Sequence, residues 1–290
     1  MNPRTIFVGL TSIRGREWAL RRTLQSLLRQ KKLKDGSKIN VYLFLSDHSY
    51  LLDAGFRGVP FVIADQIARS KLCSVKLSIR FTENIGPYRK LLPLAKIARE
   101  EGADPDPILI TADDDTLYPR DWVQRLVNAQ DRYRCVVAFR GRQIKLHNGS
   151  VGLYRSWAKK GQALLKPSLL TVPTGKDGVC YRMSQLHQDL FDDRHARLIA
   201  GHADDLWFKV HTLLTGTPSI LLHSDLLQQF PELTKRGRVV DRRTSQDEIE
   251  SLFLTINKIG GNDQTIARLD QWLQRRYSMS LYALLRGSAF

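Results

Sequence analysis

Short apolar runs alternate along the first half of the chain with stretches in which apolar residues recur at helical spacing. The runs are rich in β-branched and aromatic residues, as strands are: TIFVGL (5–10), NVYLFL (40–45), VKLSIRF (75–81) and ILITA (108–112). Helical spacing covers residues 18–30 and 88–101, and the second stretch stops at Gly102. This strand–helix alternation predicts an α/β fold with a mostly parallel sheet covered by helices on both faces.

The pattern is looser after residue 134. CVVAF (135–139), VCYRM (179–183) and SILL (219–222) are expected to be strands, and a helix is expected from Ala203 to about Leu214, whereas residues 140–171 predict no clear element. From Pro231 the chain becomes basic and polar. We expect two helices there, one from a capping box of Ser245 and Glu248 to Gly260, the other from Asn262 or Asp263. The predicted division is therefore an α/β domain over residues 1–230 and a basic helical extension over residues 231–290.

Three consecutive carboxylates, Asp113, Asp114 and Asp115, follow the apolar run 108–112 directly. Like charges this close are unstable unless a cation, a proton or hydrogen-bond donors compensate them. Ligands bind beyond the carboxyl ends of strands in open α/β sheets. On an extended strand end Asp113 and Asp115 point to the same side, where they can face one Mg²⁺ or Mn²⁺ ion with substrate phosphates, while Asp114 faces away. A helix cap is the alternative, but one Asp satisfies a cap.

A second acidic pair, Asp204 and Asp205, opens the helix expected after Ala203. The two carboxylates are either caps favoured by the helix dipole or a general base for a hydroxyl nucleophile. His223 follows the last expected strand and is either a packed or surface residue or a third metal ligand.

Two further groups of residues have open interpretations. Gly175 and Gly178 indicate either a flexible loop that approaches a ligand closely or ordinary turn glycines. Arg89 and Lys90 follow Asn84-Ile-Gly-Pro, at the start of the helical stretch 88–101, and are either phosphate contacts or a solvated helix start.

The formal net charge of +16 on 290 residues attracts polyanions such as nucleic acid, anionic lipid or phosphorylated substrates. No zinc-finger spacing, basic zipper or RNA-binding aromatic motif is present, so nucleic acid is not the expected partner. The three cysteines, Cys73, Cys135 and Cys180, fit no disulfide framework or metal site and are expected in the core. No signal peptide or membrane-spanning run is found, which predicts a cytoplasmic protein.

The C-terminal extension combines apolar residues, such as Trp272, Leu273 and Leu281, with arginines. Such a helix can lie at an anionic membrane surface, so a peripheral contact with the inner face of a membrane is one interpretation. The other is that the apolar stripe is buried against the α/β domain, which we slightly prefer.

Several of these motifs occur in the order typical of one enzyme family. Segments 7–16, 23–30, 41–46, 83–91, 110–119 and 203–209 together resemble bacterial GT-A glycosyltransferases related to family 2, of the kind found in capsule and lipopolysaccharide synthesis. The resemblance covers about residues 5–225. It implies a Rossmann-like GT-A fold and transfer of a sugar from a nucleotide diphosphate sugar to a hydroxyl of a saccharide or lipid-linked acceptor, with inversion at the anomeric carbon.

The resemblance also implies roles for particular residues. Donor-nucleotide binding falls to Thr11, Ser12, Arg14, Asp47, Asn84, Lys90, Asp113 and Asp114. The Mn²⁺ or Mg²⁺ cofactor is assigned to Asp113 and Asp115, with His223 as a further ligand, and the catalytic base is Asp205 or Asp204, with Asp205 preferred. Gly175 and Gly178 would belong to a loop at the donor sugar or acceptor.

Two other functions remain open at this point. A nucleotidyltransferase acting on a sugar phosphate shares the sheet and the metal, although the segment Gly9–Gly15 matches its glycine-rich loop poorly. A non-enzymatic basic module that binds nucleic acid or membrane is the second alternative, and it would bind DNA with a steep dependence on salt.

Overall fold

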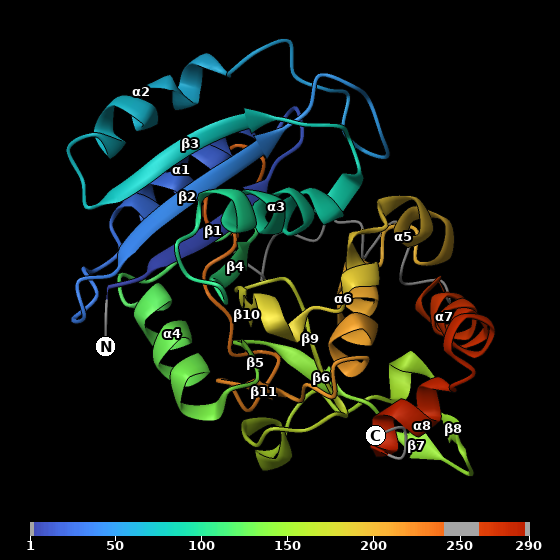
Figure 1. Ribbon diagram of the computed structural model, residues 1–290. Helices are drawn as coiled ribbons and strands as arrows, with labels where there is room; N and C mark the ends of the chain where they lie inside the picture. Colours follow the sequence, from blue (N-terminus) through green and yellow to red (C-terminus); the bar gives the residue numbers. More distant parts are fainter. Residues whose placement is uncertain (1–2, 241–260, 288–290) are drawn as a thin grey trace.

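The computed structural model describes residues 3–240 and 261–287, and its centre is a seven-stranded sheet (Figure 1). The strand order is β11-β5-β10-β4-β1-β2-β3. The strands are β1 (Thr5–Thr11), β2 (Lys38–Leu45), β3 (Val75–Phe81), β4 (Ile108–Ala112), β5 (Val136–Ala138), β10 (Val179–Arg182) and β11 (Ser219–Leu221). All neighbours pair in parallel except that β10 runs antiparallel to β4 and β5. The predicted mostly parallel sheet is confirmed.

Helices cover both faces of the sheet and enclose a separate apolar core on each. One face carries α1 (Glu17–Leu28), α2 (Phe61–Ser70) and α4 (Trp122–Tyr133). The other carries α3 (Leu92–Glu101), α5 (Asp193–Ile199), α6 (Asp204–Leu213), α7 (Asn262–Tyr277) and α8 (Leu281–Arg286). Side chains alternate between the two cores, since Ile6, Val8 and Leu10 belong to the first and Phe7 to the second. Burial on both faces explains why the strands are nearly continuous apolar runs.

The helical stretch expected over 88–101 is divided into two elements. A 3₁₀ turn, η1 (Gly86–Lys90), comes first, and α3 begins only at Leu92. Pro93 accounts for the division, because it lacks the N–H that a helix continuing from η1 would need at this position, whereas proline is tolerated in the first turn of a helix.

The region 140–171, for which the sequence predicts no clear element, consists of short pieces. They are β6 (Gly141–Gln143), β7 (Leu146–His147), β8 (Ser150–Val151), η2 (Tyr154–Ser156), η3 (Gln162–Leu165) and, at its end, β9 (Thr171–Pro173). Two further 3₁₀ turns, η4 (Met183–Gln185) and η5 (Gln188–Phe191), follow β10. β6 pairs with β9 and β7 with β8 in small antiparallel sheets. None of these elements is long enough to give a periodic sequence signal.

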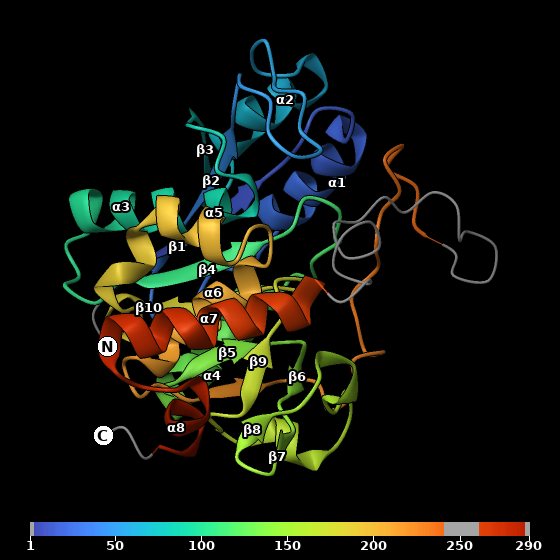
Figure 2. The same cartoon turned by 90° about the vertical axis from the view of Figure 1, so that its right-hand side faces the viewer.

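The C-terminal helices pack on the α/β domain. The expected helix start at Asn262 is confirmed, whereas the helix expected from Ser245 and Glu248 to Gly260 lies outside the described residues. Figure 2 shows α7 crossing the molecule beside α6, and the rings of Trp272 and Trp207 lie 5.2 Å apart. Leu273, Leu281, Leu284 and Leu285 are buried. The interpretation with the apolar stripe buried is therefore confirmed, and these leucines are not free to enter a membrane.

Two findings qualify the remaining expectations from the sequence. Cys135 and Cys180 are buried as expected, but the prediction for Cys73 is wrong, because this residue lies just beyond the end of α2 and is exposed. No helix within residues 3–240 or 261–287 is both long and apolar enough to cross a membrane.

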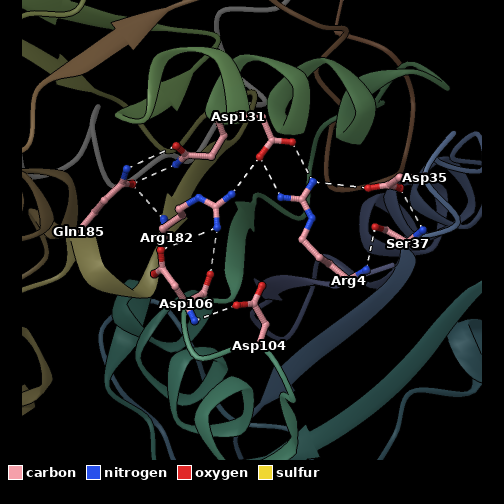
Figure 3. A network of polar contacts seen from close by, with 9 residues as sticks. Arg4, Asp35, Ser37, Asp104, Asp106, Asp131, Arg182 and Gln185 are labelled. Carbon is pink, nitrogen blue, oxygen red and sulfur yellow. Dashed lines mark hydrogen bonds and ion pairs between the residues drawn. The ribbon is translucent and has the colours of Figure 1, made fainter. Parts of the chain in front are cut away.

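An ionic network ties the sheet together at the end where β1 begins (Figure 3). The carboxylate of Asp131 on α4 accepts two hydrogen bonds of 2.8 Å from Arg4 and one of 2.9 Å from Arg182, at the end of β10. The guanidinium of Arg4 holds the pKa of Asp131 below its ordinary value. β1 and β4 run parallel to each other and away from this network. Their carboxyl ends therefore lie at the opposite end of the sheet, which is where open α/β sheets bind ligands.

Candidate functional site

A cavity of about 590 Å³ lies beyond the carboxyl ends of β1 and β4. Strand order reverses there, because β1 is followed in sequence by β2 on one side and paired with β4 on the other, which is where α/β sheets bind ligands. Ten residues that the sequence singles out line it: Thr11, Ser12, Arg89, Lys90, Asp113, Asp114, Asp115, Gly175, Asp204 and Asp205. The volume lies within the usual range for small-molecule sites, about 300 to 1,000 Å³.

The three carboxylates after β4 do not alternate as expected. The strand ends at Ala112, so Asp114 and Asp115 lie in a turn instead of an extended segment. Both contact the guanidinium of Arg16, at 3.1 Å from Asp114 Oδ1 and 3.3 Å from Asp115 Oδ2. Asp114 also accepts a short hydrogen bond from the hydroxyl of Ser12. Asp113 turns to Lys90 instead, with 3.3 Å between Oδ1 and Nζ.

This cluster retains an excess of negative charge despite its cation. Burial, followed by the charges of Asp114 and Asp113, raises the pKa of Asp115 to about 7, and Arg16 only partly offsets these effects. In turn, burial lowers the pKa of Arg16, but the three carboxylates together raise it above its ordinary value. A cation placed here would be stabilised.

The second acidic pair lies in the first turn of α6, and neither of its carboxylates caps the helix. The N-cap residue is Ala203, which has no side-chain cap. Asp204 Oδ2 lies 3.0 Å from Lys90 Nζ, and Asp205 Oδ1 accepts a 2.9 Å hydrogen bond from the N–H of Gly175. Burial raises the pKa of Asp205 to about 8, with a further contribution from the charge of Asp204. The interpretation as simple helix caps is not supported.

Lys90 connects the two acidic groups. It is buried, and its ammonium pairs with Asp113 on one side and Asp204 on the other. Burial alone would lower the pKa of Lys90, but the charges of Asp113, Asp204 and Asp205 raise it well above its ordinary value, so the ammonium stays charged.

Gly175 is required by close packing around Lys90. A Cβ at position 175 would lie 2.5 Å from Lys90 Nζ and 3.3 Å from Asp205 Oδ1. The backbone at Gly175 therefore does make a close approach, as one interpretation expected, but it approaches Lys90 and Asp205 of the site itself. Gly178 has a different role, because its φ is +100° and its backbone packs against the Trp122 ring, outside the cavity lining.

Four other residues singled out by the sequence lie outside the lining. The side chain of Arg14 is exposed, and that of Asp47 is 64% exposed beside His48. Asn84 is buried and donates to Asp53 Oδ2 at 3.1 Å. The ring of His223 packs near Phe139, and its Nδ1 lies 2.6 Å from the carbonyl of Gln228.

Several polar groups of the cavity wall are not singled out by the sequence, among them Arg16 and Asp53, whereas the singled-out Arg14 and Asp47 lie outside the lining. Asp53 and Arg89 form a buried ion pair of 2.7 Å, and the Asp53 carboxylate also accepts the N–H groups of Arg14 and Gly55. No motif marks Asp53, which lies after Asp47 in the loop that follows β2.

The segment expected to begin the C-terminal extension also contributes to the site. The N–H of Leu233 donates to the carbonyl of Asp115 at 2.7 Å, and Glu232 pairs with Lys176 beside the cavity. Residues 231–240 thus cross the end of β4, so the boundary expected at residue 230 does not separate the site from the C-terminal part of the chain.

The carboxylates fit a divalent cation held partly by a ligand. Within residues 3–240 and 261–287 no three His, Cys, Asp or Glu side chains converge to hold a metal on their own. Mg²⁺ and Mn²⁺ sites on phosphate substrates need only one or two protein carboxylates, because the phosphates complete the shell. Asp115 and Asp113 can supply these carboxylates, each from beside a cation of the protein, Arg16 and Lys90 respectively.

Comparison with known proteins supports the fold. No protein-family model matches the chain, and no curated protein matches it in sequence. Among solved structures, a mannosyltransferase from Pyrobaculum calidifontis in complex with GDP-Man and Mn²⁺ aligns over 100% of this chain and 70% of its own, with 14% identity and a TM-score of 0.55. TarS from S. aureus in complex with UDP-GlcNAc aligns over 95% and 73%, with 15% identity and a TM-score of 0.46. The chain has the GT-A, Rossmann-like fold.

Proposed function

We propose that this chain is a metal-dependent, inverting glycosyltransferase that moves a sugar from a nucleoside diphosphate sugar to a hydroxyl acceptor. One observation carries the proposal: a single cavity combines a cation-seeking carboxylate cluster with a separate buried acid whose pKa is near neutral. Diphosphate departure and hydroxyl deprotonation require these two kinds of group.

The donor would lie between the two acidic groups. Asp113 and Asp115 would hold Mn²⁺ or Mg²⁺, which supplies positive charge to the departing diphosphate. Lys90, fixed by Asp113 and Asp204, is a permanent cation in the same wall. The polar residues Thr11 and Ser12 line the β1 side of the cavity, where the nucleotide would bind.

Asp205 is the proposed base. Its Oδ1 is fixed by the Gly175 N–H, which orients Oδ2 to accept the proton of the acceptor hydroxyl. The acceptor oxygen then bonds to the anomeric carbon as the bond from that carbon to the diphosphate breaks on the opposite face. A pKa of about 8 makes the carboxylate a stronger proton acceptor than an ordinary Asp.

The resemblance to surface-glycan enzymes supports a role in bacterial polysaccharide synthesis at the cytoplasmic side of the membrane. The net charge of +16 would favour encounter with anionic donors and acceptors. His223, Asp47 and Arg14 have no part in the proposed chemistry, because they lie outside the cavity lining.

A panel of sugar nucleotides tests the proposal. Thermal unfolding is measured with UDP-, GDP-, dTDP- and CMP-sugars, with and without Mn²⁺, because a ligand that binds only the folded state raises the melting temperature. We expect one nucleotide class to stabilise the protein, and more strongly with Mn²⁺. Release of the nucleoside diphosphate confirms glycosyl transfer, whereas release of pyrophosphate would assign the site to a nucleotidyltransferase. No stabilisation by any member would refute the proposal.

A further inference from the structure

Arg142 lies in the cavity wall with an unusual set of neighbours. It belongs to β6 and is only 7% exposed. Its guanidinium carbon lies 4.6 Å from the centroid of the Tyr154 ring, so the planar group is stacked on an aromatic face. None of the ion pairs within residues 3–240 and 261–287 includes Arg142. The other arginines of the cavity, Arg16, Arg89 and Arg140, each pair with an aspartate.

A buried guanidinium without a carboxylate is costly unless a ligand supplies the negative charge. Arg142 also interacts with the Tyr154 hydroxyl through a side-chain hydrogen bond, and a guanidinium has further N–H donors whose fork matches the oxygens of a phosphate. Arg142 is held in place by its surroundings, because Tyr154, on which it stacks, is fixed by a 2.7 Å hydrogen bond from its N–H to Asp263 on α7. The position is therefore prepared before any ligand arrives.

The location of Arg142 separates it from the donor end of the cavity. The nucleotide end is formed by β1, the loop around Asp53 and η1, whereas Arg142 enters from β6, with Tyr154 and Asn262 beside it in the lining. Tyr154 and Asp205 line the same cavity; burial raises the pKa of Tyr154, Arg142 opposes this, and the charge of Asp205 adds to it. Asp205 accepts a hydrogen bond from the N–H of Gly175 and Asp263 accepts one from the N–H of Tyr154, so each has a partner other than Arg142.

We infer that Arg142 binds a phosphate group of the acceptor and thereby positions the acceptor hydroxyl at Asp205. The inference rests on the proposed function, since it names the acceptor class of that same site. The phosphate can belong to a phosphate-containing saccharide or to a lipid-linked diphosphate, because the guanidinium recognises the shared oxygen arrangement.

Titration with phosphate probes tests the inference on the full chain. The protein is first saturated with Mn²⁺ and the nucleoside diphosphate that stabilises it most, so that the donor end is filled. Inorganic phosphate and glycerol 3-phosphate are then titrated by calorimetry against the wild type, Arg142→Met and Arg142→Lys. We expect Arg142→Met to weaken phosphate binding by about tenfold or more, as loss of a charge-assisted hydrogen bond does, and Arg142→Lys to be intermediate.

Arg155→Met is the matched control. Arg155 follows Tyr154 directly but is exposed, so the variant removes the same charge without touching the cavity. It should bind the probes as the wild type does. Equal loss in both variants would reduce the effect to net charge and overturn the inference. Unchanged phosphate binding by a folded Arg142→Met protein would also overturn the inference. If the variant instead bound the nucleotide more weakly, Arg142 would be assigned to the donor.

Two further arms separate the possible outcomes. Farnesyl diphosphate in detergent micelles, compared with glycerol 3-phosphate, distinguishes a lipid-linked acceptor from a soluble one. Glucuronate tests specificity, and Arg142-dependent binding of glucuronate in preference to phosphate would overturn the phosphate assignment. If no sugar nucleotide binds, the proposed function fails. The same titrations without nucleotide then show whether a phosphate site at Arg142 stands on its own.

Discussion

Both acidic groups of the cavity consist of aspartates, but the negative charge is compensated differently in each group. The carboxylates of Asp114 and Asp115 contact one guanidinium, and Asp114 also accepts a hydroxyl hydrogen bond. At α6, Asp204 pairs with Lys90, whereas the hydrogen bond to Asp205 comes from a neutral backbone N–H. Burial raises the pKa of one member in each group, to about 7 at Asp115 and about 8 at Asp205.

The way in which its charge is compensated decides which role a carboxylate is suited to. A cluster with several oxygens directed at one cation is suited to bind positive charge. A single acid held by a neutral donor, with a like charge beside it, is suited to accept a proton. Lys90 touches both groups and keeps them from repelling each other across the cavity.

Asp205→Asn should have the largest effect. If Asp205 is the base, its loss lowers the rate of transfer by about 10²- to 10⁴-fold while the nucleotide still binds, because the amide cannot accept the proton. The measurement is the rate of nucleoside diphosphate release at saturating donor, together with the dissociation constant of the nucleotide with Mn²⁺. Near-normal turnover in this variant alongside an inactive Asp204→Asn would exchange the two roles.

The same variant should be more stable than the wild type near neutral pH. The pKa of Asp205 is raised from 3.8 to about 8 on folding, so the wild type loses stability as pH rises from about 4 towards 8, and the neutral amide avoids this loss. Asp193→Asn is the matched control, because Asp193 also lies in the first turn of a helix but belongs to α5, away from the cavity. A melting temperature that falls for Asp205→Asn would argue for a structural role.

Lys90→Met tests whether one lysine holds both groups together. The variant leaves Asp113 and Asp204 without their buried cation, which typically costs about 3 to 5 kcal/mol of unfolding free energy. Urea unfolding measures the loss. Lys96→Met, an exposed lysine on α3, should be nearly neutral. Equal stability of the two variants would mean that the acidic groups are independent.

Asp115→Asn should act on the cation-binding group alone. Removing one carboxylate charge should weaken Mn²⁺-dependent nucleotide binding by roughly tenfold to hundredfold, on the scale of a hydrogen bond to a charged group. Calorimetry with and without Mn²⁺ gives the affinity, and circular dichroism checks the fold. Binding that keeps its full dependence on Mn²⁺ would remove Asp115 from the metal site.

The sequence predicts the fold well because the first four strands give a strong signal. β1, β2 and β4 are apolar runs that are mostly buried on both faces, and the edge strand β3 begins with alternating buried and exposed residues, so periodicity and composition locate them without knowledge of their partners. The strand–helix–strand order then fixes the parallel arrangement. The pieces within 140–171 lack such a signal, because β6 to β9 have two or three residues each, and β6 finds its partner β9 only at the far end of this region.

The site could be predicted where it adjoins an element that the sequence locates. Asp113 to Asp115 follow β4, Asp204 and Asp205 open α6, and all five residues line the cavity. Asp53 and Arg142 come from a loop and from a very short strand, and their roles depend on partners such as Arg89 and Tyr154 that only folding brings near. His223 shows the reverse case, since a position after a strand does not by itself direct a side chain into the site.

The smallest effect that we expect is a shift in the pH dependence of the rate, which distinguishes the roles of Asp204 and Asp205 on α6. A base must be deprotonated, so the rate of nucleoside diphosphate release should rise with pH until Asp205, with its pKa of about 8, has lost its proton. Burial is the main cause of the raised pKa, and the negative charge of Asp204 is the second. Asp204→Asn removes that charge, so the pKa of Asp205 falls and the acidic limb of the profile moves to lower pH, while Asp193→Asn leaves it in place. A limb that stays fixed or moves to higher pH in Asp204→Asn would show that the titrating group is not Asp205, and the base would then have to be sought among the other carboxylates of the cavity.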